Sequence, residues 1–186
     1  MRSHALVLAA AAAITLVSCG PLPAPQSATL PADLRDSAAD PIRGSVYSLA
    51  YTFGTPSSVA GNPAAVADTL VKLEYLATAL PGDPRSYAVN PVSMSGLNDA
   101  RAEARSIYGI APTAAPQEVI QSLHAAASAL RAGDAPGARQ MLAQGPFSDP
   151  ARSLAMLNAL PAMPITAAAT RSLANEFTAM DSVHRR

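Results

Sequence analysis

The chain has 186 residues, which is room for one domain of modest size and an additional segment. Its 13 basic and 13 acidic residues cancel, so the clustered positive charge that nucleic-acid binding needs is not expected, and no nucleic-acid partner is predicted. The single cysteine excludes an intramolecular disulfide framework and a zinc site built from cysteines. Hydrophobic residues make up 49% of the chain, but 42 residues are alanine, so few large apolar side chains remain for a core.

Residues 1–18 have the pattern of a secretory signal peptide. Arg2 and His4 precede a predominantly apolar run over residues 5–17. As a helix this run spans roughly 20 Å, which is shorter than the ~30 Å hydrocarbon core of a bilayer. We therefore expect a cleaved leader rather than a permanent transmembrane helix.

The leader ends in Leu16-Val17-Ser18-Cys19-Gly20, which resembles the lipobox of bacterial lipoproteins. The resemblance covers residues 1–20 and implies cleavage before Cys19 and acylation of that cysteine with chains such as palmitate. Two or three acyl chains hold a protein stably on a membrane. The absence of Asp at position 20 implies the periplasmic face of the outer membrane rather than the inner membrane. The alternatives are release into the periplasm by ordinary signal peptidase and a core helix in which Cys19 is simply buried.

The next segment, residues 19–41, reads as a lipidated cysteine followed by a tether. It contains five prolines, which favour extended backbone, and few large apolar residues. A fully extended segment of this kind reaches roughly 65 Å. We expect it to be a mobile spacer, with the folded domain over residues 42–186.

The domain is predicted to be all-α, an irregular bundle of about six to seven short to medium helices with Pro- and Gly-rich connections. Helical spacing of apolar residues predicts helices over 42–53, 62–80, 94–108, 116–131, 134–143, 149–160 and 165–184. The first of these also alternates like a strand, but no second strand is present to pair with it.

The helix over residues 62–80 has the strongest local signals. Asn62 is a good N-cap and Pro63 suits the first helical position. One apolar stripe follows, formed by Val66, Leu70, Leu73, Leu76 and Leu80. This helix is expected to lie centrally, with its stripe facing the helices at 116–131 and 165–183.

Candidate catalytic groups are scarce. His124 and His184 lack a second ligand at helical spacing, and Ser93-Met94-Ser95-Gly96 reads as a helix start. Four glutamates on predicted helices read as exposed surface charges: Glu74, Glu103, Glu118 and Glu176. We therefore predict no catalytic, cofactor-binding or metal site, and a protein that is not an enzyme.

Residues 129–142 resemble the turn of a tetratricopeptide-type repeat, through Gly133-Asp134 and Gly137-Ala138. No second copy follows at the 34-residue period, so the segment is predicted to be a general helical hairpin.

The function expected from these patterns is that of a lipid-anchored helical module of the cell envelope that binds or scaffolds a protein partner. The alternatives are a periplasm-facing carrier of small molecules or lipids and an enzyme acting on the cell wall. An apolar surface patch would favour the module, and a large apolar cavity would favour the carrier.

Overall fold

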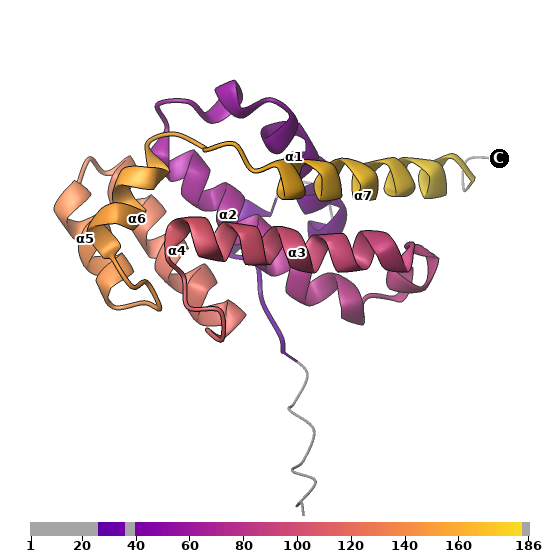
Figure 1. Ribbon diagram of the computed structural model, residues 1–186, viewed down its shortest axis with the longest axis horizontal. Helices are drawn as coiled ribbons and strands as arrows, with labels where there is room; N and C mark the ends of the chain where they lie inside the picture. The colour runs from indigo at the N-terminus through magenta and orange to yellow at the C-terminus, as the bar shows by residue number, and fades with distance from the viewer. Residues whose placement is uncertain (1–25, 36–39, 184–186) are drawn as a thin grey trace, which may run out of the picture.

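The computed structural model describes residues 26–35 and 40–183, and there the chain folds as an all-α bundle (Figure 1). This confirms the predicted fold class. The seven α-helices are α1 (Pro41–Gly54), α2 (Pro63–Ala79), α3 (Pro91–Tyr108), α4 (Pro116–Arg131), α5 (Ala135–Ala143), α6 (Pro150–Leu157) and α7 (Pro164–Val183). The described residues also contain four short 3₁₀ helices: η1 (Ala32–Leu34) precedes α1, and η2 (Pro56–Val59), η3 (Leu80–Gly82) and η4 (Pro84–Ala88) lie between the α-helices.

Most helices begin at a proline that follows a capping Asp or Asn. In α2, the Asn62 side chain accepts a hydrogen bond of 3.0 Å from the Ala65 N–H, and Pro63 has no N–H that would need a partner. Asp or Asn side chains directly before a proline cap α1, α3 and α6 in the same way. This repeated local signal explains why the predicted helix starts are nearly correct.

Two helix ends differ from the prediction. Helix α3 begins at Pro91, so Ser93 lies inside its first turn, and Asn90 caps the helix instead. Helix α6 ends at Leu157 rather than near residue 160, because Pro161 and Pro164 favour extended backbone over this stretch.

Helix α2 is at the centre of the bundle, as predicted. All five residues of its apolar stripe are at most 1% exposed. Helix α4 packs antiparallel on α2, whereas α7 packs mainly on α1 and α3 (Figure 1). The expectation that the α2 stripe faces α7 is therefore wrong, because α3 and α1 supply the surface that α7 covers.

The segment before α1 is not a free spacer over its described part. Leu30 is 2% exposed and Leu34 is 8% exposed, and both belong to the hydrophobic core. The Thr29 N–H donates to Gln117 Oε1 at 2.8 Å, which ties the segment to the start of α4. Residue 42 is therefore too late as the start of the packed domain, because the two leucines before it bury apolar surface in the core.

None of the helices in the described part of the chain combines the length and the apolar character needed to cross a bilayer. Cys19 and His184 lie outside the described residues, so the expected lipidation site stays a prediction.

Candidate functional site

One face of α3 carries a row of polar side chains. Asn98, Arg101 and Arg105 are spaced three and four residues apart, which places them on the same side of a helix. Ala102 and Ser106 lie on the same face and leave the row accessible. The row faces the C-terminal half of α2 and the loop that follows α3.

Arg105 anchors this face to α2. Its Nε donates to Glu74 Oε1 at 2.7 Å and its Nη2 donates to Glu74 Oε2 at 2.8 Å. The side chains of Arg105 and Glu74 are 7% and 3% exposed, so the pair is buried. A bidentate pair of this kind compensates the cost of removing two charges from water, and it fixes the register of α3 against α2.

The remaining nitrogen of Arg105 organises the loop after α3. Its Nη1 donates to the carbonyl oxygens of Pro112 at 2.8 Å and Ala114 at 3.0 Å. Gly109 makes the turn possible, because it has a φ of +66°, which favours glycine. The same loop is held from the other side by the Ser148 N–H, which donates to the Gly109 carbonyl at 2.9 Å.

A groove runs along this face of α3, and we call it the Arg101 groove. It consists of two adjoining hollows of about 280 Å³ and 430 Å³ that share Asn98 and Arg101. Its walls come from α3 and the loop after it, the end of α2, η3 and the first described residue of the chain: Gln26, Ala77, Thr78, Pro81, Gly82, Asn98, Arg101, Ala102, Arg105, Ser106 and Pro112.

Arg101 is the charged group of the groove. Within the described residues its guanidinium makes one hydrogen bond, a long one of 3.4 Å to Thr78 Oγ1, and no ion pair. Burial lowers the pKa of Arg101, although an arginine keeps its proton at every physiological pH. The groove therefore holds a half-buried cation that no described carboxylate neutralises directly.

A second polar cluster lies where the N-terminal segment crosses α2 and α4. Arg131 pairs with Asp68, and His124 Nε2 lies 3.4 Å from Asp33 Oδ1. His124 is partly buried, as expected, and its Nδ1 and the Asp68 Oδ1 have no hydrogen-bond partner among the described residues. Burial raises the pKa of Asp68, although Arg131 acts in the opposite direction.

Three of the four glutamates are not simple surface charges, contrary to expectation. Glu74 is buried in the pair with Arg105. Glu103 accepts hydrogen bonds from the Thr166 N–H at 2.8 Å and the Thr166 hydroxyl at 2.7 Å, so it caps the start of α7 from α3. Glu118 is exposed, as expected.

Glu176 has the same role at the other end of the α3–α7 pair. It accepts from the Asn90 N–H at 2.8 Å and from the Ser93 hydroxyl. The Ser93 hydroxyl therefore bonds to α7 and does not cap the start of its own helix. Sequence reasoning missed these contacts because each joins two helices that are far apart in the chain.

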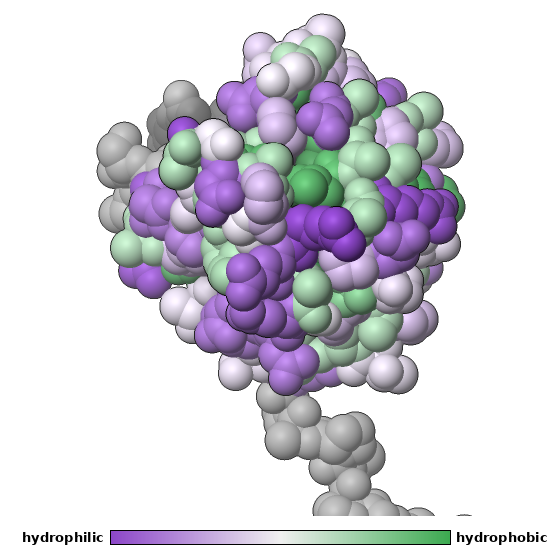
Figure 2. Space-filling model, turned by 90° about the vertical axis from the view of Figure 1, so that its left-hand side faces the viewer, coloured by the Kyte–Doolittle hydropathy of each residue, from purple (hydrophilic) through white to green (hydrophobic). Residues whose placement is uncertain are grey.

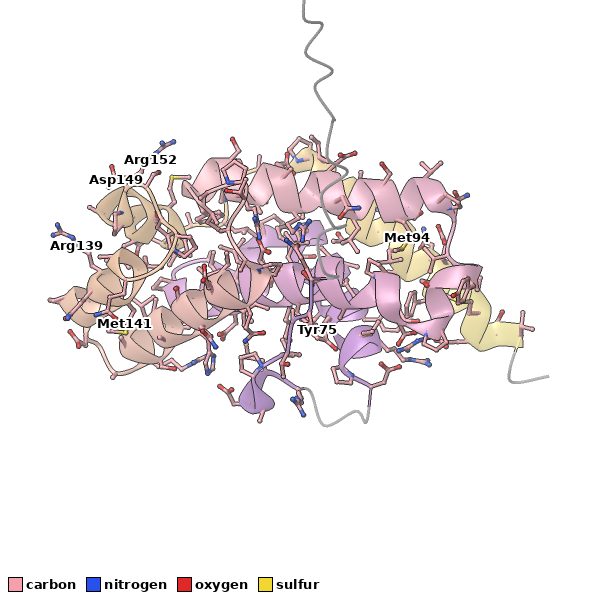
Figure 3. All side chains as sticks on the ribbon, turned by 90° about the horizontal axis from the view of Figure 1, so that it is seen from below. Tyr75, Met94, Arg139, Met141, Asp149 and Arg152 are labelled. Atoms are coloured by element: carbon pink, nitrogen blue, oxygen red, sulfur yellow. The ribbon has the colours of Figure 1, made fainter. Side chains whose placement is uncertain are left out.

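The α5–α6 end of the molecule carries an apolar patch. Figure 2 shows this end, where apolar side chains gather near the centre and strongly polar side chains border them. The half-buried apolar residues of α5 and α6 are Met141, Leu154 and Met156, and Leu130 at the end of α4 and Leu160 after α6 are half-buried as well. Arg139 and Arg152 point outward at this end (Figure 3), and neither forms an ion pair with another described residue.

No group of three or more metal-binding side chains occurs among residues 26–35 and 40–183. The spacing of Asn98, Arg101 and Arg105 was the sequence signal that could have indicated the polar face of α3. Comparison with known proteins finds no family model, no curated protein and no solved structure that matches this chain.

Proposed function

We propose that the protein is a lipid-anchored module of the cell envelope that binds a protein partner through the α5–α6 end. The lipobox-like residues around Cys19 support the anchor. The observation that carries the binding role is the apolar patch at the α5–α6 end, the end at which Arg139 and Arg152 point outward. Apolar patches rimmed by polar residues are typical of protein interaction sites.

The composition of the patch suits a protein surface. Met141 and Met156 have flexible, polarisable side chains that adapt to an irregular partner surface. Arg139 and Arg152 add charge at the rim, and arginine is enriched among the residues that dominate binding energy. A partner with an apolar centre and acidic groups around it would complement this end.

The helices behind the patch support binding because contacts with the rest of the bundle hold them in place. Helix α5 packs on α4, and α6 is held to the end of α3 by Ser153, whose hydroxyl donates to the Tyr108 carbonyl at 2.7 Å. A surface that is already ordered loses little conformational entropy when a partner binds.

The test is photocrosslinking in living cells. A photoreactive amino acid replaces Arg139, and a matched variant carries it at Arg171, an exposed residue of α7. We expect a discrete protein adduct from position 139 and none from position 171, and we expect Leu154→Asp to abolish the adduct. The same pattern from both positions, or no adduct from position 139, would contradict the proposal.

A further inference from the structure

We propose that the Arg101 groove binds the phosphate of a phospholipid headgroup in the membrane that anchors the chain. The lipid source of this phosphate depends on the proposed anchor at Cys19. The phosphate site itself depends on the charge, the hydrogen-bond donors and the position of the groove.

The charge of the groove suits a single anion. Arg105 lines the groove, but Glu74 neutralises it through two hydrogen bonds. Arg101 therefore contributes the net positive charge, and its guanidinium has one long hydrogen bond of 3.4 Å within the described residues. A phosphodiester carries one negative charge and several acceptor oxygens, and a guanidinium binds two of them side by side.

The remaining walls match the rest of a headgroup. Asn98 and Ser106 present an amide and a hydroxyl on the same face as Arg101, and both can donate to phosphate or glycerol oxygens. The apolar side chains of Ala77 and Pro81 line the adjoining hollow of about 430 Å³. This volume is within the range of small-ligand sites.

The position of the groove places it near the membrane. Gln26 lines the groove and is the first residue of the chain that the structure describes. Cys19 precedes Gln26 by seven positions, and a chain of that length spans at most about 25 Å. An acylated Cys19 would therefore keep the groove within about 25 Å of the lipid headgroups.

The N-terminal segment, residues 26–35, holds Gln26 in a constant position relative to the groove. It runs antiparallel to α2, with Gln26 beside Pro81 and Leu34 beside Asp68. Burial of Leu30 and Leu34 fixes the segment on the domain, so Gln26 stays beside the groove.

The test titrates the full-length protein, purified in a neutral detergent, with dihexanoyl-phosphatidylglycerol. Calorimetry measures the affinity, and the side-chain amide signals of Gln26 and Asn98 report binding in the groove by NMR. We expect saturable binding that shifts both signals. Arg101→Gln should weaken it about tenfold or more, because one charge-assisted contact is lost. Arg101→Lys should retain part of the affinity, and Arg171→Gln should leave it unchanged.

Several outcomes would overturn the proposal. The first is that the lipid does not bind, and the second is that Arg101→Gln and Arg171→Gln lower its affinity equally. The third is that the NMR signals of Gln26 and Asn98 do not shift when the lipid is added. If inorganic phosphate bound as tightly as the lipid, the groove would be a site for a free anion and not for a lipid headgroup. Circular dichroism melting of Arg101→Gln separates lost binding from lost folding. Because the lipid is added in solution, the result does not require acylation of Cys19, which fractionation of Cys19→Ala tests separately.

Discussion

Arg105 on α3 holds Glu74 on α2 through two parallel hydrogen bonds of 2.7 and 2.8 Å, and the same guanidinium donates to three backbone carbonyls of the following loop. One buried side chain thus positions α2, α3 and the edge of the Arg101 groove. In a core where many buried positions are alanine, such polar contacts restrict how the helices can pack.

The first prediction concerns this pair. Arg105→Met should lower the free energy of unfolding by ~3–5 kcal/mol, because it leaves the Glu74 carboxylate buried without a partner. The double variant Glu74→Leu/Arg105→Met should be less destabilised than the single variant, because no buried charge remains. Urea denaturation measures both. Arg171→Met is the matched control, and a loss no larger than that of the control would contradict a structural role for the pair.

The second prediction concerns the N-terminal segment. Leu30→Ala should cost ~2–5 kcal/mol, the range for a buried leucine, although this residue lies twelve positions before the expected domain start at 42. Ser27→Ala, at an exposed position of the same segment, should change stability by less than about 0.5 kcal/mol. Chemical denaturation of the two variants decides the matter. Equal and small effects would mean that the segment is a spacer after all.

The third prediction is a pair of opposite pH dependences. Burial raises the pKa of Asp68 above the ordinary aspartate value of 3.8, whereas hydrogen bonding from Arg85 lowers the pKa of Asp83 below it. A raised pKa means that the folded state binds the Asp68 proton more tightly than the unfolded state does. Ionisation of Asp68 therefore lowers stability as the pH rises above about 3.8. For Asp83 the sign is reversed, so its contribution is complete above about 3.8 and is lost as the pH falls through the lowered pKa.

These signs are measured by comparing Asp68→Asn and Asp83→Asn with the unmodified protein from about pH 3 to pH 6. With rising pH, the protein should lose stability relative to Asp68→Asn and gain stability relative to Asp83→Asn. Parallel curves for the two variants would show that the environments of these carboxylates differ less than the structure indicates.

The fourth prediction concerns the anchor. Cys19→Ala should abolish cleavage before position 19 and move the protein out of the detergent phase when the membranes are partitioned. The reason is that acyl chains on this cysteine are the expected attachment to the membrane. Metabolic labelling with a palmitate analogue provides a direct readout. Unchanged processing together with unchanged partitioning would exclude the lipoprotein assignment.

The local elements could be predicted from the sequence. The capping Asn62 with Pro63 and the apolar stripe that follows marked α2 as a central helix, and similar signals located the other six helices. These features depend on residues within one or two turns of each other, so a local pattern contains the information. The predicted end of α3 at residue 108 is likewise correct, and Gly109 follows it in the left-handed conformation that favours glycine.

The polar contacts between helices were decided only by the tertiary structure. Glu74, Glu103 and Glu118 are all glutamates on helices, yet one is buried against Arg105, one caps α7 and one is exposed. Which of these environments each glutamate occupies depends on the rotation and register of helices that are distant in sequence. Likewise Leu30 became part of the core only because its segment packs onto helices that come later in the chain. The sequence by itself thus determined which segments are helical, while the packing of those helices decided which charges are paired, where the Arg101 groove lies and where the domain begins.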